Sequence, residues 1–343
     1  MKTIALGMSG GVDSSIAVHL LQEAGWQVIG LHLKLLDASG RDNQASQDAQ
    51  AVADFFGIPL HLVDAREDFK SLVTGPFAEA YRQGRTPNPC VRCNQTIKFG
   101  RLWQEARALG ASHLATGHYA RILERDGHFG LYRGLNHKKD QSYFLYGIDR
   151  QVLPQVRFPL GDYSKDQVRA LAAQLGLPVA SKSDSQEICF IANDDYPAWL
   201  EQHCPNLPAK GQFLTPDGQV LGQHQGAWRY TIGQRKGLGL ALGYPAYVEG
   251  IDAAKGTVTL GDGSGLYRDQ LVASQVNWLA GGQAFSGRAI AKIRSRGEGS
   301  PAHWQRTNDR LEVTFDAPVR AITPGQSVVL YDGDRVLGGG IID

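Results

Sequence analysis

The stretch GMSGGVDSS, residues 7–15, decides the fold of this chain. It follows a short apolar run, Ile4–Leu6, and precedes apolar residues at helical spacing, so the sequence predicts a strand, a glycine turn and a helix. Such a turn directs backbone N–H groups and the positive end of a helix dipole at an anion, which favours a phosphate group. Gly10 and Gly11 permit backbone angles that other residues avoid, so a phosphate can approach the main chain closely.

The side chains of this loop add polar groups to the predicted phosphate site. Ser9, Ser14 and Ser15 offer hydroxyl groups, and Asp13 either caps the helix or takes a catalytic role, for example beside a metal. The loop is not a Walker A motif, because no Gly-Lys-Ser/Thr follows. It resembles the SGGxDS pyrophosphate loop of ATP pyrophosphatases, which implies cleavage of ATP between its α and β phosphates. The alternative is an ordinary glycine turn before a capped helix.

The first part of the chain alternates predicted strands and helices. The strands are Ile4–Gly7, Val28–Leu33, Leu60–Val63 and His113–Thr116, and the helices are Asp13–Ala24, Asp42–Phe56, Asp68–Gln83 and Gln95–Leu109. This alternation predicts an α/β fold, a parallel sheet with helices on both faces. Ligands then bind beyond the carboxyl ends of the strands, where the glycine loop, Leu33 and Gly117 all lie. From Tyr143 to Gln202 the pattern predicts helix, most clearly over Lys165–Leu175.

The character of the chain changes after about residue 207. Glycines become frequent, helical periodicity weakens, and short apolar runs alternate with turns, including the hairpin signal Asp332-Gly333-Asp334. A chain of 343 residues is also too long for one typical core. We therefore expect three domains: an ATP-binding domain over residues 1–207, a small central β-rich domain over 208–270, and a C-terminal β-barrel over 271–343.

Composition limits the partners and the location. The formal net charge is +1, so any contact with a nucleic acid has to come from local basic patches. The sequence has no apolar stretch of 18 residues and no signal-peptide pattern, which predicts no membrane association and a cytoplasmic location. There the four cysteines are reduced and available for catalysis or metal binding.

Three cysteines stand in informative contexts. Cys90 and Cys93 form a C-x-x-C before a predicted helix, where a helix N-terminus and Arg92 lower the thiol pKa, and Cys189 lies about a hundred residues further on. The set fits catalytic thiols that carry a persulfide and resolve it as a disulfide bond, or an iron–sulfur cluster with one open iron position. It also fits structural zinc with His203 or Cys204 as a fourth ligand; otherwise Cys204 is structural.

Seven spaced motifs together resemble the tRNA-specific 2-thiouridylase family of the MnmA type over essentially the whole chain. They are Gly7–Ser14, Asn88–Phe99, Ala115–Tyr119, Lys139–Tyr146, Ser185–Ile191, Gly226–Gly237 and Lys292–Arg296. The resemblance implies an adenine-nucleotide hydrolase-like α/β domain, a central β domain and a C-terminal β-barrel. It implies that ATP adenylates the C2 oxygen of the wobble uridine of tRNAs for Lys, Glu and Gln, and that sulfur then displaces AMP. It also implies Mg²⁺ as a cofactor and sulfur supplied by a cysteine desulfurase or a sulfur-relay protein.

The resemblance also implies roles for individual residues. Cys93 is the first catalytic cysteine and Cys189 carries the persulfide. ATP is contacted by Gly7, Met8, Ser9, Gly10, Gly11, Val12, Asp13, Ser14, Leu33 and Gly117. The target base is faced by Asn88, Pro89 and Cys90, and tRNA is contacted by His118, Lys139, Asp140, Gln141, Arg294, Ser295 and Gln326.

One position departs from the family pattern. Well-known members carry aspartate where this chain has Cys90, and cysteine cannot replace a carboxylate as a general base or electrostatic support. Cys90, Cys93 and Cys189 instead resemble the cluster-binding set of other tRNA thiolation enzymes. Our hypothesis is that the three thiols hold a [4Fe–4S] cluster, with the persulfide and disulfide route as the alternative.

Basic and aromatic residues gather in three stretches, which predicts local nucleic-acid contacts. They are Arg133 with His137–Lys139, Trp228–Tyr230 with Arg235 and Lys236, and the barrel residues Arg288, Lys292, Arg294, Arg296 and Arg306. Aromatic rings there are expected to stack on bases while the cations hold phosphates. Two other functions stay open: an amide-forming synthetase that adenylates another carbonyl, which would need no thiols, and a zinc-containing RNA-binding module, which would leave the loop unexplained.

Overall fold

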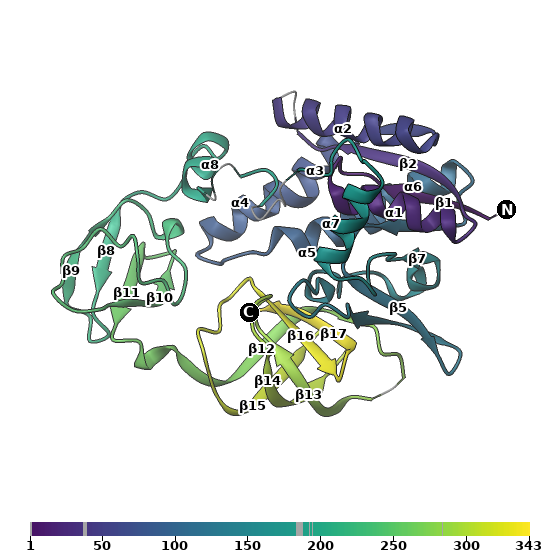
Figure 1. Ribbon diagram of the computed structural model, residues 1–343. Helices are drawn as coiled ribbons and strands as arrows, with labels where there is room; N and C mark the ends of the chain where they lie inside the picture. The colour runs from purple at the N-terminus through teal and green to yellow at the C-terminus, as the bar shows by residue number, and fades with distance from the viewer. Residues whose placement is uncertain (1, 37–39, 183–187, 192, 194, 283) are drawn as a thin grey trace.

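The computed structural model describes residues 2–36, 40–182, 188–191, 193, 195–282 and 284–343. Figure 1 shows an N-terminal α/β domain, a small β domain joined to it through α8, and a β-barrel packed beneath the α/β domain. Among the described residues, no helix combines the length and the apolar character needed to cross a membrane.

The α/β domain is built on a five-stranded parallel sheet of order β3-β2-β1-β4-β7. The strands are β1 (Thr3–Gly7), β2 (Gln27–Lys34), β3 (Leu60–Asp64), β4 (His113–Thr116) and β7 (Val156–Arg157). Side chains of β1 alternate between two cores. Ile4 and Leu6 pack with helices α1 (Val12–Glu23) and α2 (Gly40–Phe56), whereas Ala5 packs with α6 (Leu102–Ala108) on the opposite face. The predicted parallel sheet with helices on both faces is confirmed.

The helix that carries the C-x-x-C begins earlier than the sequence indicated. A continuous helical segment runs through α5 (Pro89–Cys93), a π-helix η2 (Asn94–Arg101) and α6, so both cysteines lie inside the helix rather than in a turn before it. Proline suits the first position of a helix, because its missing N–H has no intrahelical acceptor there. The preceding helical stretch likewise divides into α3 (Arg66–Phe69), a π-helix η1 (Lys70–Thr74) and α4 (Gly75–Arg82).

The middle of the chain differs most from the prediction. A hairpin, β5 (Ala120–Arg125) and β6 (His128–Arg133), was not expected. The predicted helix over Tyr143–Gln202 is wrong for its first part, which forms the 3-10 turns η3 (Ser142–Phe144) and η4 (Arg150–Gln155). Here Tyr143 and Tyr146 are buried against the barrel, and Pro154 interrupts the helical hydrogen bonds. Helices α7 (Lys165–Gln174) and α8 (Tyr196–His203) are present as expected.

The central domain is a four-stranded sheet of order β10-β11-β8-β9. Its strands are β8 (Gly211–Leu214), β9 (Val220–His224), β10 (Tyr247–Asp252) and β11 (Thr257–Gly261), and short 3-10 turns lie at η6 (Ala227–Arg229) and η7 (Ser264–Leu266). Phe213, Val248 and Val258 are fully buried in its core. This small hydrophobic core is separate from those of the other domains, as expected for a β-rich central unit.

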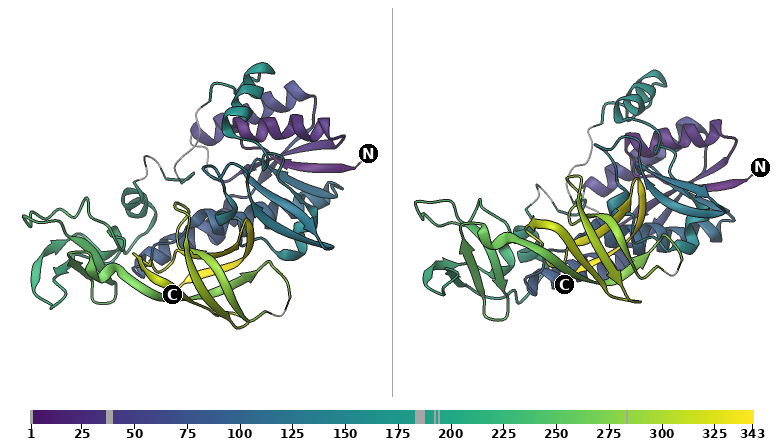
Figure 2. Two further views of the ribbon diagram at one scale, coloured as in Figure 1. Left: turned by 60° about the horizontal axis from the view of Figure 1, so that its bottom comes forward. Right: turned by 90° about the horizontal axis from the view of Figure 1, so that it is seen from below.

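Six antiparallel strands form the barrel. They are β12 (Tyr267–Trp278), β13 (Ser286–Lys292), β14 (Ser300–Arg306), β15 (Leu311–Arg320), β16 (Ser327–Asp332) and β17 (Arg335–Ile342), and pairing of β12 with β17 closes the barrel. The predicted hairpin between Asp332 and Arg335 is confirmed. The pair Arg335–Tyr132 then joins β17 to β6, so that the hairpin of the α/β domain extends the barrel sheet (Figure 2).

Candidate active site

The glycine loop has the close-packed backbone that the sequence predicted. Gly10 has a φ of +69°, and a Cβ there would lie 2.5 Å from the carbonyl oxygen of Ala45 in α2, so only glycine fits. Ser14 and Ser15 are buried and donate their hydroxyl hydrogens to the carbonyl of Gly11 at 3.1 and 2.9 Å. The backbone N–H of Ser9 donates to the hydroxyl of Ser14 at 3.3 Å. These bonds fix the loop without a ligand.

The other predicted nucleotide contacts surround this loop. Met8 is buried and forms backbone hydrogen bonds to β2, while Leu33 lies near the end of that strand. A Cβ on Gly117 would lie 2.9 Å from the backbone nitrogen of Ser14, so glycine is required where β4 ends against α1. Gly7 closes β1, and Val12 begins α1 as a buried residue. The structure thus brings the predicted nucleotide-contacting residues to one edge of the sheet.

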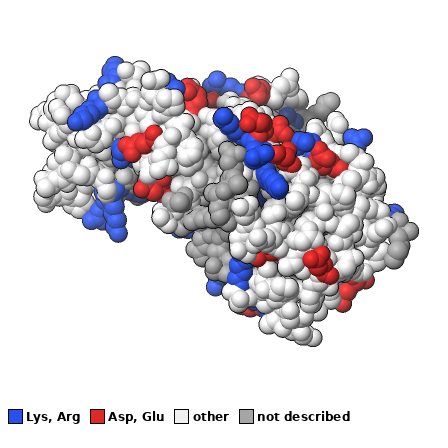
Figure 3. All heavy atoms as spheres, turned by 90° about the horizontal axis from the view of Figure 1, so that it is seen from above, with Lys and Arg blue, Asp and Glu red and all other residues white. Residues whose placement is uncertain are grey.

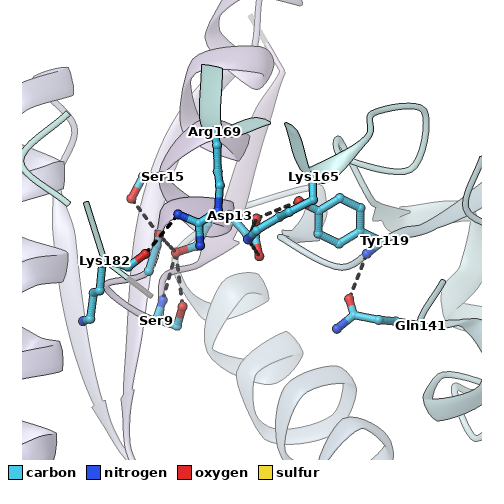
Figure 4. Close-up of polar contacts among 10 residues, drawn as sticks. Ser9, Asp13, Ser15, Tyr119, Gln141, Lys165, Arg169 and Lys182 are labelled. Atoms are coloured by element: carbon cyan, nitrogen blue, oxygen red, sulfur yellow. Dashed lines mark hydrogen bonds and ion pairs between the residues drawn. The ribbon is translucent and has the colours of Figure 1, made fainter. Parts of the chain in front are cut away.

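Asp13 is held by two residues from distant parts of the chain. The ammonium group of Lys165 donates to both of its carboxylate oxygens, at 2.8 and 2.9 Å, and the hydroxyl of Tyr119 donates to Oδ1 at 2.8 Å (Figure 4). The expectation that Asp13 caps α1 is wrong, because the N-cap is Gly11 and no side chain caps it. A metal ion on Asp13 would have to displace Lys165, which is itself almost completely buried.

Lys182 lies on the other side of the loop (Figure 4). It donates to the carbonyl of Gly10 at 3.0 Å and to Oδ2 of Asp48 at 2.5 Å. Burial is the largest single effect and raises the pKa of Asp48, but the hydrogen bonds from Lys182 and Gln44 and the charge of Lys182 together hold that pKa below its usual value. Lys165 and Lys182 could not be assigned to this site from the sequence, because neither belongs to a motif whose spacing connects it with the loop.

The cysteine helix α5 is fixed at its start by Asn88. This residue is the N-cap, and its Oδ1 accepts the N–H of Val91 at 3.4 Å. Pro89 and Cys93 are buried, whereas Cys90 is exposed. Cys93 packs in an apolar cluster with Phe190, whose ring also contacts Phe69 and Phe77 edge-on. Phe190 thereby holds the exposed Cys189 beside the C-x-x-C helix.

The predicted lowering of the thiol pKa values is wrong. Although Cys90 and Cys189 reach the surface, the protein packed around them and around the buried Cys93 removes hydration from a thiolate. This raises the pKa of all three thiols, that of Cys189 to about 12. The neighbouring cysteines raise the pKa of Cys189 further, which shows that the three thiols lie within electrostatic reach of one another. Lys98 lowers the pKa of all three, although less than burial raises it.

The four cysteines are the candidate donors for the iron–sulfur cluster and the zinc site considered from the sequence. All four cysteines are free thiols in this structure. Within the described part of the chain, no three His, Cys, Asp or Glu side chains are close enough to hold one metal ion, so neither metal site gains support there. The two cysteine segments nevertheless lie near each other, because Cys93 packs in the same apolar cluster as Phe190, the residue after Cys189. Of the motif Ser185–Ile191, residues 185–187 lie outside the described residues.

Lys98 links the cysteines to the nucleotide edge. Its ammonium nitrogen lies 3.4 Å from Nε2 of His118, whose Nδ1 is 2.6 Å from the hydroxyl of Thr116. His118 is buried, and burial first and Lys98 second lower its pKa well below the usual value, so the imidazole is neutral. His118 also directly follows Gly117, the residue packed against the glycine loop. Lys98, whose charge acts on the thiols, therefore contacts a residue that borders the predicted phosphate site.

Most of the side chains expected to contact tRNA form hydrogen bonds within the protein. The carboxylate of Asp140 accepts the N–H groups of Gly134 and Ser142, both at 3.1 Å. Gln141 accepts the N–H of Tyr119 at 2.9 Å, and Lys139 is half-buried. In the barrel, Arg294 is exposed and donates to the carbonyl of Arg320, Ser295 is half-buried, and Gln326 faces the segment before the cysteine helix.

The predicted aromatic stacking surface is wrong at two positions. Trp228 and Tyr230 are buried in the protein, so their rings are not presented to bases. Lys292 is also buried, whereas Arg235, Lys236, Arg294 and Arg296 are exposed. On the face seen in Figure 3, positive and negative side chains are interspersed. Electrostatic attraction of a nucleic acid would therefore depend on a few local cations.

The glycine loop at the carboxyl edge of a parallel sheet, followed by two β domains, defines a class of nucleotide-binding α/β proteins. Residues 2–193 match the family described as tRNA methyl transferase HUP domain, which implies use of ATP. Residues 198–262 match its PRC-barrel domain, and residues 268–342 match the aminomethyltransferase beta-barrel domain.

Full-length relatives make the assignment more specific. The chain is 48% identical to the tRNA-specific 2-thiouridylase MnmA of Syntrophotalea carbinolica, covering 99% of this chain and 98% of that protein. It is 47% identical to the protein of the same name from Trichlorobacter lovleyi, covering 100% and 98%, and 44% identical to that from Geotalea uraniireducens, covering 100% and 95%. The chain belongs to the MnmA family.

Proposed function

We propose that this protein is an ATP-dependent tRNA-uridine 2-sulfurtransferase that acts on the wobble uridine of tRNAs for Lys, Glu and Gln. The observation that supports the proposal is the glycine loop beside Gly117 and His118, with Lys98 next to His118 and acting by its charge on three thiols. An enzyme that only activated a carbonyl with ATP would need the loop but not the thiols. A tRNA substrate implies a cytoplasmic location.

Activation takes place at the glycine loop. A uracil oxygen is a poor leaving group, so the C2 oxygen first attacks the α-phosphate of ATP, and pyrophosphate departs. Backbone N–H groups at the start of α1 stabilise the charge on the departing pyrophosphate. Lys165 and Lys182 supply positive charge on either side of the loop. Mg²⁺ enters on the ATP phosphates rather than on Asp13, whose oxygens accept hydrogen bonds from Lys165 and Tyr119.

Sulfur transfer takes place at the cysteines, and one route uses a persulfide. The terminal sulfur of a Cys189 persulfide attacks C2, and AMP leaves with the original oxygen. Cys93 then attacks the sulfur of Cys189, so a Cys93–Cys189 disulfide forms and both electrons of the broken S–S bond stay with the uracil sulfur. The sulfur comes from a cysteine desulfurase or a relay protein. Lys98 favours the anionic sulfur species in this buried site.

The second route uses Cys90, and we favour it. Cys90, Cys93 and Cys189 would together hold a [4Fe–4S] cluster through three thiolate ligands, which a chain with aspartate in place of Cys90 would not offer. When bound, such a cluster supplies an open iron position that accepts sulfide. Exposed Cys90 and Cys189 leave this side of the site open to an incoming sulfur donor and to the target base.

Two measurements test these proposals. Incubation with tRNA, ATP and a sulfur donor should retard the tRNA in a mercury-containing gel and release pyrophosphate. Pyrophosphate release without thiolation, whatever sulfur donor is supplied, would instead favour an amide-forming synthetase. Anaerobic purification followed by iron and sulfide analysis separates the two sulfur routes, because fully active protein without iron excludes the cluster.

A further inference from the structure

The segment Arg85–Pro87 lies where the three domains meet, between α4 and α5 (Figure 1). We call it the junction segment. The guanidinium group of Arg85 donates to the carbonyl of Ile342 at 2.8 Å, at the end of the barrel. The N–H of Thr86 donates to the carbonyl of Pro324 at 2.8 Å, and its hydroxyl donates to Thr231 of the central domain at 3.1 Å. Both β domains therefore hold this short stretch of the α/β domain.

Gln326 completes the contact from the barrel. Its Nε2 donates to the carbonyl of Thr86 at 2.9 Å and lies 3.5 Å from that of Pro87. The adjacent Gly325 has a φ of +90°, and a Cβ there would lie 3.0 Å from the backbone of Thr86. Both its φ and this close approach require glycine. The loop of the barrel that contains Gly325 and Gln326 thus packs closely against the backbone of the junction segment.

The junction segment leads directly into the cysteine helix and is stiff. Pro87 and Pro89 have fixed φ angles, and each restricts the residue before it, so few dihedral angles between Thr86 and Cys90 can absorb a displacement. Asn88, between the two prolines, is the N-cap of α5. A shift of Thr86 is therefore transmitted to the start of the helix that carries Cys90 and Cys93.

The geometry points to Gln326 as a positioning residue for the cysteines: through the backbone of the junction segment, the barrel sets where α5 lies relative to the nucleotide edge. This inference rests on the proposed function. It differs from the expectation that Gln326 acts by contacting tRNA, because its amide donor is directed at the carbonyls of the protein itself. A tRNA that binds the barrel would then meet cysteines already in place.

The test compares two glutamine substitutions in the barrel. Gln326→Glu preserves shape but places an ionised acceptor against two carbonyl oxygens. Gln305→Glu, at an exposed position of β14, adds the same charge away from the junction segment and is the control. At saturating tRNA and ATP, we expect single-turnover thiolation by Gln326→Glu to fall about 10- to 100-fold, since small misplacements of reacting groups have such effects. The Kd for tRNA should match that of Gln305→Glu.

A second variant removes any dependence on the side chain of residue 326. Gly325→Ala places a methyl group against Thr86, and we expect it to slow thiolation in the same way. Both variants should also change the alkylation rate of the exposed Cys90, measured without tRNA or ATP, relative to wild type and Gln305→Glu. Thermal unfolding of each variant verifies that it is folded.

The outcomes separate this inference from the proposed function. A tenfold weaker Kd for Gln326→Glu, with thiolation restored at saturating tRNA, would identify a direct tRNA contact and overturn the inference. Unchanged Cys90 alkylation in both variants would also overturn it, whatever the activity. A wild-type protein that never forms 2-thiouridine would refute the proposed function, whereas the alkylation rates would still test the junction segment.

Discussion

The two ends of the candidate active site are built in opposite ways. At the nucleotide end, hydrogen bonds from serine hydroxyl groups, Lys165 and Lys182 hold the glycine loop in place before a ligand arrives. At the sulfur end, three thiols meet from segments about a hundred residues apart, in surroundings that disfavour their anionic form. On this account ATP binds at a preformed loop, whereas the cysteine thiols must first be converted to their reactive anionic form.

The largest expected effect is the loss of thiolation, without loss of pyrophosphate release, when Cys93 is replaced. Cys93→Ser should lower tRNA thiolation by at least about a thousandfold, because the sulfur step loses a reacting or ligating thiol. Pyrophosphate release in the presence of tRNA should remain, since the glycine loop is intact. Cys204→Ser, a half-buried cysteine at the end of α8, is the matched control and should keep both activities. Normal thiolation by Cys93→Ser would refute the account of the sulfur end.

A second substitution tests the nucleotide end. Asp13→Ala leaves the buried Lys165 without its carboxylate, and we expect pyrophosphate release to fall about a hundredfold because charge near the phosphates is no longer held in place. Asp166→Ala, an exposed acidic residue next to Lys165, should have little effect. Equal losses of pyrophosphate release in the two variants would show that Asp13 contributes only its negative charge, and that its contact with Lys165 has no specific role.

The sulfur end should respond strongly to pH. Because burial raises the pKa of Cys189 to about 12, only a small fraction is thiolate at neutral pH, and that fraction grows as pH rises toward the pKa. Alkylation of Cys189 by iodoacetamide in the metal-free protein should therefore accelerate roughly tenfold per pH unit between about pH 7 and 9. Peptide mass spectrometry follows the reaction. A rate that does not increase above pH 7 would mean that Cys189 is already thiolate at neutral pH, which contradicts a raised pKa.

A smaller effect is expected where the sheet edge meets the loop. Gly117→Ala places a methyl group 2.9 Å from the backbone nitrogen of Ser14, and we expect the KM for ATP to rise about tenfold, which corresponds to roughly 1.4 kcal/mol. Gly250→Ala in the central domain, where a Cβ meets only ordinary contacts at 3.5 Å, is the control. An unchanged KM in Gly117→Ala would place the nucleotide away from this edge.

The smallest expected effect concerns tRNA binding by the barrel. Arg294 is exposed, and Arg294→Ala should lower the slope of log Kd against log salt concentration by about one, the contribution of a single phosphate contact. Filter binding at several salt concentrations measures this slope. Arg310→Ala, an exposed arginine paired with Glu312, should leave the slope unchanged. Equal slopes for wild type and Arg294→Ala would exclude a phosphate contact there.

The features that could be predicted from the sequence are those set by local residue patterns, and those that could not depend on tertiary packing. The glycine loop, the parallel sheet and the barrel hairpin at Asp332 follow from local spacing and turn residues, and the structure has them. Lys165 and Lys182 could not be placed beside the loop, because only tertiary packing brings them across more than 150 residues.

One error could have been avoided from the sequence, and two others have physical causes that single-sequence patterns do not show. The hairpin β5–β6 has a two-residue turn, Asp126-Gly127, with positive φ at both residues, which is a hairpin signal in the sequence itself. The expected thiol activation at a helix N-terminus was wrong because burial dominates. Trp228 and Tyr230 suggested a stacking surface but are needed for packing.

The most direct test of the account is a single turnover with tRNA for Lys, ATP and a sulfur donor under anaerobic conditions, followed by mass spectrometry of the nucleosides. The account predicts 2-thiouridine at the wobble position, with one AMP and one pyrophosphate released for each sulfur incorporated. Thiolation without AMP release, or AMP release without 2-thiouridine when sulfide and iron are both supplied, would contradict it.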